Sequence, residues 1–260
     1  MPHPPIIMPD IGRGEEKKAG ATVRALESCS KEIGEKAPQT IVLITPHGPV
    51  FKDAVVVMMN SSLKGHMGRF GRPDIRLDFE NDIELSRKIL ELGQKRDIPC
   101  LGMDSRVAKS YGVSTSLDWG ALVPLYFVTS QYRGFRLVHI TISFLEFEKL
   151  YKFGTIIGEA AKSLQRDVVV IASGDLSHRL SEDGPYGFNP AGPKLDRAII
   201  EYIKRGDVEG LMNLDTKLIE EGGECGLRSI IMGLGTLDGQ ELMSDVLSYE
   251  GPFGVGYGVA

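Results

Sequence analysis

The sequence predicts an α/β protein. Short runs of β-branched residues alternate with longer stretches in which apolar residues recur every three or four positions, as expected for strands interleaved with helices. The run DVVVIA at residues 167–172 is almost wholly apolar, which is typical of a strand covered by helices on both faces. A length of 260 residues suits one large α/β domain, so we expect residues 1–260 to form a single domain.

The predicted elements follow from these patterns in chain order. Strands are expected at residues 6–8, 40–45, 54–59, 99–102, 122–128, 137–143, 167–172, 241–249 and 254–259. Helices are expected at residues 15–34, 81–96 and 145–164, and over most of residues 190–237. The glycine-rich segment at residues 61–74 is predicted to be a mobile loop over a site.

Composition excludes several classes of protein. The net charge is −5 and the basic residues are scattered, so nucleic acid is not an expected ligand. No apolar run approaches the roughly 20 residues that cross a bilayer, and no signal peptide is visible, so we expect no membrane association. The three cysteines, Cys29, Cys100 and Cys225, do not suggest a disulfide framework. Together these features predict a cytoplasmic protein.

Three of the five histidines lie in turns beside predicted strands. His3 is in PHPP, where the flanking prolines restrict the backbone, while His47 is in TPHG after strand 40–45. His178 closes SGDLSH after strand 167–172. Because α/β proteins place their sites at the carboxyl ends of strands, these histidines are candidates for one site. His139 is expected to be a packed strand residue, and His66 either contacts a substrate or faces water.

Glu224 is the acidic residue with the most specific context. It follows two glycines in EEGGECGLRS and precedes an apolar helix, where a carboxylate can cap the helix N-terminus. A more specific alternative is that it joins two histidines in the facial triad of Fe(II) sites that activate oxygen. His3, His47 and Glu224 could supply such a set of metal ligands, although no local spacing shows that they meet. Phosphate-loop, serine-hydrolase elbow and zincin motifs do not occur.

Five motifs occur together in one order: PHPP, TPHG, LDWGALVPL, SGDLSH and GECGLRS. With them the sequence resembles the LigB-type class III extradiol ring-cleavage dioxygenases, especially the relatives associated with AMMECR-type and Memo-like proteins. The similarity extends over essentially the whole chain. It implies a three-layer α/β/α sandwich of the LigB-like type, with Fe(II) at one edge of the central sheet.

The resemblance also implies roles for individual residues. His3 and His47 match the metal-binding histidines of the family, and Glu224 is the best match to its carboxylate ligand. His178 matches the acid/base histidine beside the metal, and Asp175 is expected to hold His178 or its turn. The implied reaction opens a catechol-like or aminophenol-like ring with O₂, with Fe(II) as the cofactor and Zn²⁺ as the alternative.

Two departures from the family pattern favour a different function. Trp119 stands where many of these dioxygenases have the histidine of D-H-G, and Cys225 stands where Memo-like relatives have a cysteine. We expect Glu224 rather than Cys225 to bind, because a carboxylate suits Fe(II).

Two other functions therefore stay open. One is a Memo-like metal-binding protein that works with other proteins or a radical-SAM enzyme and cleaves no ring. The other is a zinc hydrolase with a metal-bound water. The oligomeric state also stays open, with a homo-oligomer among the alternatives. The resemblance further suggests an AMMECR-type domain in the full-length protein.

Overall fold

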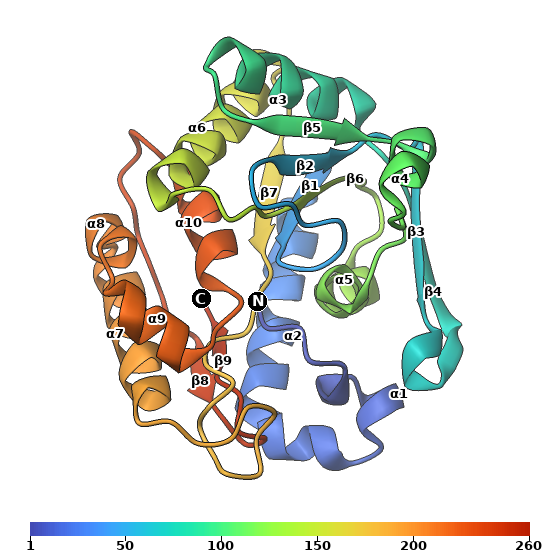
Figure 1. The fold of residues 1–260 in the computed structure, drawn as a ribbon. Helices are drawn as coiled ribbons and strands as arrows, with labels where there is room; N and C mark the ends of the chain where they lie inside the picture. Colours follow the sequence, from blue (N-terminus) through green and yellow to red (C-terminus); the bar gives the residue numbers. More distant parts are fainter.

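A mixed five-stranded sheet forms the middle of the computed structural model, which describes residues 1–260 (Figure 1). Its strand order is β5-β2-β6-β1-β7. Strands β6, β1 and β7 run parallel, whereas β2 is antiparallel to β6 and parallel to β5. The bounds are β1 Thr40–Thr45, β2 Val55–Met58, β5 Cys100–Met103, β6 Arg136–Thr141 and β7 Val168–Ala172.

Helices cover both faces of this sheet (Figure 1). Successive residues of a strand point to opposite faces, so Leu43 of β1 packs in one apolar core and Val42 in the other. The first core includes α2 and α5, and the second includes α3, α6 and α10. Their bounds are α2 Gly20–Lys36, α5 Trp119–Gln131, α3 Ile83–Lys95, α6 Phe147–Ser163 and α10 Leu227–Gly235. The predicted α/β fold, with helices packed around the sheet, is confirmed.

The remaining elements lie around the central sheet and these helices. They are η1 Pro5–Ile7, α1 Pro9–Gly12, η2 Glu15–Ala19, α4 Ser105–Tyr111, α7 Ala191–Arg205, α8 Val208–Met212 and α9 Thr216–Gly222, with the hairpins β3 (Ser62–Met67)/β4 (Arg72–Glu80) and β8 (Ser248–Glu250)/β9 (Tyr257–Val259). The turn η3 (Gly68–Phe70) joins β3 to β4. None of the helices combines the length and the apolar character needed to span a bilayer.

Residues 122–128 are the middle of helix α5, so the predicted strand is wrong. The run is buried on nearly all sides, and an uninterrupted apolar run does not distinguish a buried helix from a buried strand. Asp118 caps the helix by accepting a hydrogen bond of 2.8 Å from the amide of Gly120. Pro124 lies inside α5 and has no N–H for the carbonyl of Gly120, four residues earlier.

The glycine-rich segment is the hairpin β3–β4 rather than a loop. Leu63, Gly65 and Met67 are buried and alternate with more exposed residues, which is the period of a strand with one covered face. Gly65 is needed there because a Cβ atom would lie 2.4 Å from the carbonyl oxygen of Leu117. The glycines that suggested a loop therefore serve close packing and the turn.

Three predicted strands are shorter or absent. Residues 6 and 7 of the first fall on the 3₁₀ turn η1, because Pro4 and Pro5 lack the N–H groups that a strand ladder requires. The strand predicted at 241–249 is limited to β8, and the one predicted at 254–259 is limited to β9.

His139 of β6 is a packed residue, as predicted. It is fully buried, and neither ring nitrogen has a hydrogen-bond partner. Desolvation lowers its pKa from 6.5 to about 4, because burial disfavours the charged imidazolium. Between these two pH values the unfolded chain binds more protons than the folded chain. Stability therefore decreases as the pH falls through this range.

We expect the substitution His139→Leu to remove this acid sensitivity. Between pH 7 and pH 4 the unfolding free energy of the wild type should fall by about 3 kcal/mol more than that of the variant. Urea denaturation at several pH values measures this difference. The control is His66→Leu, at an exposed histidine, which should follow the wild type. Parallel pH curves for wild type and His139→Leu would contradict a buried neutral imidazole.

Candidate metal centre

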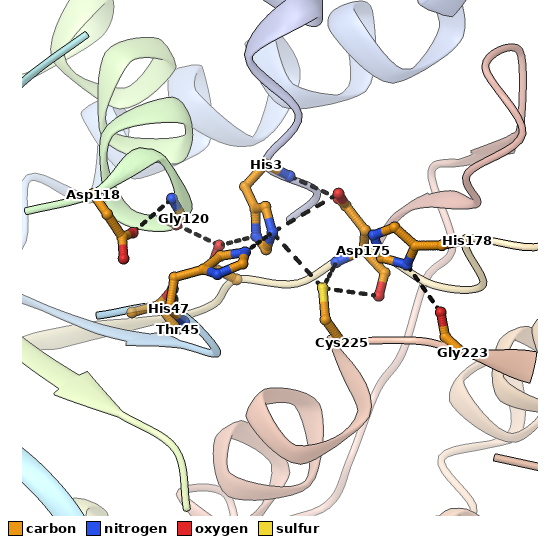
Figure 2. A network of polar contacts seen from close by, with 10 residues as sticks. His3, Thr45, His47, Asp118, Gly120, Asp175, His178, Gly223 and Cys225 are labelled. Atoms are coloured by element: carbon orange, nitrogen blue, oxygen red, sulfur yellow. Dashed lines mark hydrogen bonds and ion pairs between the residues drawn. The ribbon is translucent and has the colours of Figure 1, made fainter. Parts of the chain in front are cut away.

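Three ligand atoms from distant parts of the chain converge at the carboxyl edge of the sheet (Figure 2). They belong to His3 near the N-terminus, His47 after β1 and Cys225 before α10. The Nε2 atoms of the two histidines are 3.0 Å apart, and the Sγ atom of Cys225 is 3.7 Å from Nε2 of His3. All three atoms lie within 4.8 Å of one another. We call this group the His-His-Cys cluster.

Two glycines allow the loops of the site to meet. A Cβ atom at Gly174 would lie 2.1 Å from the Cα atom of Gly226, so the two backbones touch where neither has a side chain. Across this contact the amides of Cys225 and Gly226 donate to the carbonyl oxygen of Asp175 at 3.2 and 2.9 Å. The motifs SGDLSH and GECGLRS are therefore joined through their backbones.

The N-terminal segment is fastened to the loop after β7. The Met1 ammonium donates to the carbonyl of Ala172 at 2.8 Å, and the Gly174 amide donates to the carbonyl of Met1 at 3.0 Å. The amide of His3 donates to Oδ1 of Asp175 at 2.9 Å. The carboxylate of Asp175 thus holds the backbone of His3, while its backbone oxygen joins the turn before His178 to the loop of Cys225.

Ser173 determines which nitrogen of His3 is free. Its hydroxyl donates to the carbonyl of Gly120 at 2.5 Å, the carbonyl that Pro124 leaves without a helical partner. Having donated its proton, the hydroxyl must accept from Nδ1 of His3, which is 2.9 Å away. His3 is therefore protonated on Nδ1, and its Nε2 lone pair faces the cluster.

His47 is packed between α5 and the cluster. Trp119 lies against its ring, with centroids 4.4 Å apart at an angle of 43°. The first turn of α5 can come this close because Gly120 has no side chain: a Cβ atom there would be 2.9 Å from Cδ2 of His47. Trp119 thus covers one side of a cluster histidine.

Burial keeps both cluster histidines neutral. Desolvation lowers the pKa of His3 to about 3 and that of His47 to about 4, so near pH 7 each offers a lone pair. The same effect raises the pKa of the Cys225 thiol well above its usual value. The amide of Asp175 donates to Sγ of Cys225 at 3.3 Å, a contact that favours the thiolate once a cation is present.

His178 lies beside the cluster with one nitrogen free. Its Nδ1 donates to the carbonyl of Gly223 at 3.0 Å, so the neutral ring carries its lone pair on Nε2. Ligand atoms of Asp175, His178 and Cys225 also lie within 4.8 Å of one another (Figure 2). This places a proton acceptor next to the candidate metal ligands.

Comparison with known proteins identifies the family. Residues 1–260 match the family described as the catalytic LigB subunit of aromatic ring-opening dioxygenase. The chain belongs to the LigB family.

Three curated relatives match this chain at different levels of sequence identity and coverage. The Clostridium acetobutylicum protein CA_C1420 is 44% identical over 259 residues, which cover 100% of this chain and 55% of that protein. A 3,4-dihydroxyphenylacetate 2,3-dioxygenase of Escherichia coli is 28% identical over 63% of this chain and 60% of its own length. A MEMO1 family protein of Pyrococcus furiosus is 26% identical over 67% of this chain and 56% of its own length. The aligned regions thus span little more than half of each relative.

A solved structure shows the same fold. The crystal structure of the uncharacterized protein JW3007 from Escherichia coli K12 has a TM-score of 0.59 at 14% identity, covering 89% of this chain and 90% of that one. At this identity the likeness concerns the architecture alone.

Glu224, the carboxylate expected from the LigB resemblance, is not brought to the two histidines. It is a helix cap: its Oε2 accepts a hydrogen bond of 2.6 Å from the amide of Leu227 in the first turn of α10. Burial raises its pKa to about 7. Neighbouring residues of a tight turn point in different directions, so only one of Glu224 and Cys225 can face the histidines. In this structure that residue is Cys225.

We expect Ser173→Ala to weaken metal binding while leaving the fold intact. The variant removes the acceptor that fixes the His3 tautomer, and loss of such a partner typically lowers metal affinity 10- to 100-fold, by order of magnitude. Competition with a chromogenic chelator measures the affinity. The matched control is Ser30→Ala, a buried serine whose hydroxyl donates to the carbonyl of Leu26, away from the cluster. Equal affinities in the two variants would contradict the role of Ser173.

Proposed function

We propose that this LigB-family chain is a metal-dependent dioxygenase that opens a catechol-like or aminophenol-like ring. The observation that carries the proposal is the convergence of two neutral imidazoles and a thiol at one point. His3, His47 and Cys225 would hold the metal, with Cys225 in place of the carboxylate expected from the sequence. O₂ is the second substrate, and both of its atoms enter the opened product.

The donor atoms fit a single metal ion. A tetrahedral centre with ordinary metal–nitrogen and metal–sulfur bonds separates two nitrogens by about 3.3 Å and nitrogen from sulfur by about 3.6 Å. The corresponding separations here are 3.0 Å between the two Nε2 atoms and 3.7 Å from His3 Nε2 to Sγ. Both imidazoles are already in the unprotonated form that a metal requires.

Fe(II) is the proposed ion, with Zn²⁺ as the alternative. A bound Fe(II) would supply open positions at which a diol and O₂ can be held side by side. Imidazole ligands suit iron and zinc alike, while a thiolate makes the site softer than the usual two-histidine carboxylate triad. Metal analysis of protein purified without added metal distinguishes the two ions.

His178 is the proposed acid–base residue. Its Nε2 lone pair is free because Nδ1 is engaged with Gly223, so it can take a proton from a substrate hydroxyl and return it later. A carboxylate oxygen of Asp175 lies within 4.8 Å of a ring nitrogen of His178 and of Sγ of Cys225, so His178 faces the cluster. The hydrogen bond to Gly223 keeps the ring oriented through both steps.

A Memo-like role without ring cleavage is the second candidate. Two residues support this role. Cys225 lies in the cluster where the dioxygenase pattern predicts a carboxylate ligand, and Trp119, which stands in place of the histidine of D-H-G, packs against His47. Oxygen uptake by Fe(II)-loaded protein with a panel of catechols and aminophenols separates the two functions. Uptake with ring-opened product supports the dioxygenase, and silence with metal in place supports the Memo-like role.

Metal content should depend on Cys225 and not on Glu224. We expect Cys225→Ser to lose most of the bound metal, because a neutral hydroxyl replaces a potential thiolate. Glu224→Gln should keep close to one equivalent per chain, since its amide oxygen can still cap α10. Elemental analysis after dialysis against metal measures both variants. Retention in Cys225→Ser together with loss in Glu224→Gln would restore the carboxylate triad and reject the His-His-Cys site.

His178→Ala should keep its metal and lose turnover. Three ligand atoms converge without His178, whereas an acid–base group contributes on the order of 10² to 10⁴ in rate. Metal content and kcat are measured on the same preparation of His178→Ala and compared with those of the wild type. The KM for a chelating diol is expected to change far less than kcat. A variant that loses its metal would make His178 a ligand instead.

A further inference from the structure

A second cavity lies away from the metal centre, between helix α2, strand β4 and the end of helix α5. Its volume is about 770 Å³. Trp119, which lies against His47, begins α5, whereas Thr129 and Gln131 at the other end of this 13-residue helix line the cavity. At a rise of 1.5 Å per residue the two ends of α5 are about 18 Å apart. The cavity is therefore separate from the His-His-Cys cluster.

The charged side chains of this cavity are mostly cationic. Four of them are basic and two are acidic, although the whole chain has a net charge of −5. The basic residues are Arg24 and Lys31 of α2, Arg76 of β4 and Arg133 after α5, and the acidic residues are Glu27 and Asp74. We call this cavity the arginine groove. A concave surface with an excess of positive charge raises the local concentration of anions.

The arginines of the groove have no acidic partner. No carboxylate lies within 4.0 Å of the guanidinium groups of Arg24, Arg76 or Arg133. The carboxylate of Asp74 is occupied by Arg72, whose Nε and Nη2 donate to it at 2.9 and 2.7 Å. The groove therefore keeps an uncompensated positive charge.

Two of these arginines are oriented by the inner nitrogen of the guanidinium. Nε of Arg76 donates to the carbonyl of Pro73 at 2.6 Å, and Nε of Arg133 donates to the carbonyl of Thr129 at 3.0 Å. The terminal nitrogens of both groups make no hydrogen bond within the protein. A guanidinium held in this way offers two parallel N–H groups, which match the oxygens of a phosphate.

Helix α2 adds a row of donors along one side of the groove. Arg24 and Lys31 lie on the same side of the helix because seven residues are close to two full turns, and Ser28 lies between them. About 10 Å of helix separates Arg24 from Lys31, so one phosphate group cannot bridge the two positions. This spacing suits a chain of phosphates.

We infer that the arginine groove binds a small molecule that carries a chain of two or more phosphate groups. The volume of about 770 Å³ falls within the range of small-molecule sites, roughly 300 to 1,000 Å³. The donors come from three separate elements, so a chain of phosphates can contact all of them at once. The inference is independent of ring cleavage, because no residue of the groove belongs to the metal centre.

Calorimetric titration of the purified full chain with inorganic tripolyphosphate and with orthophosphate tests the inference. Tripolyphosphate is expected to bind at least about tenfold more tightly, since one further hydrogen bond to a charged group is worth such a factor. The triple variant Arg24→Gln/Arg76→Gln/Arg133→Gln should weaken tripolyphosphate binding by about tenfold or more. Its melting temperature should stay that of the wild type, because all three side chains are exposed.

The matched control is the triple variant Arg87→Gln/Arg106→Gln/Arg197→Gln. It removes the same charge from three exposed arginines that do not line the groove. Nε of Arg197 donates to the carbonyl of Pro193 at 3.2 Å, so this residue also reproduces the way in which Arg76 and Arg133 are held. The control should bind tripolyphosphate within about twofold of the wild type.

Tripolyphosphate also binds metal ions, so His47→Ala is titrated in the same way and should keep the wild-type affinity. Loss of binding in His47→Ala with retention in the groove variant would place the anion at the cluster and overturn the inference. Equal weakening in the two triple variants would overturn it as well, and so would equal affinity for the two phosphates. A lack of ring cleavage would reject the proposed function and leave these results unchanged.

Discussion

The hydrogen bond from the Ser173 hydroxyl to the carbonyl of Gly120 links the fold to the chemistry of the site. It exists because Pro124 cannot use that carbonyl within α5, and it forces Ser173 to accept from His3. Helix α5, which lies on one face of the sheet, thereby sets the tautomer of His3 at the N-terminus. The motifs LDWGALVPL, SGDLSH and PHPP are thus connected by hydrogen bonds through Gly120, Ser173 and His3.

Burial and glycine packing act together around these motifs. Gly174 and Gly226 let two loops touch, and the resulting enclosure removes water from His3 and His47. Desolvation is the main reason that both imidazoles are neutral, and the Met1 ammonium lowers the pKa of His3 further. The same enclosure is unfavourable for a free thiolate, so burial raises the pKa of the Cys225 thiol well above its usual value.

Much of the site could be predicted from local sequence. Strand ends located His47 and His178, and the prolines around His3 indicated a rigid terminus. The sequence-based choice of Glu224 over Cys225 differs from the structure, because the direction of adjacent side chains depends on the contact between Gly174 and Gly226, which are far apart in sequence.

Helix α5 could not be distinguished from a strand because nearly all of its residues are apolar and buried. Only the capping residue Asp118 indicates a helix, and Pro124 argues against one. The β3–β4 hairpin shows the opposite failure, since its glycines suggested a loop while its alternating apolar residues already carried a strand period.

Trp119 is the only tryptophan in the chain, and its indole lies against a cluster histidine and beneath a guanidinium. Indole emission is quenched by nearby protonated imidazole and by open-shell transition-metal ions. The protein therefore carries an intrinsic optical probe beside the His-His-Cys cluster. A single emission band reports on occupancy and protonation of that cluster, free of background from any second indole and without an attached dye.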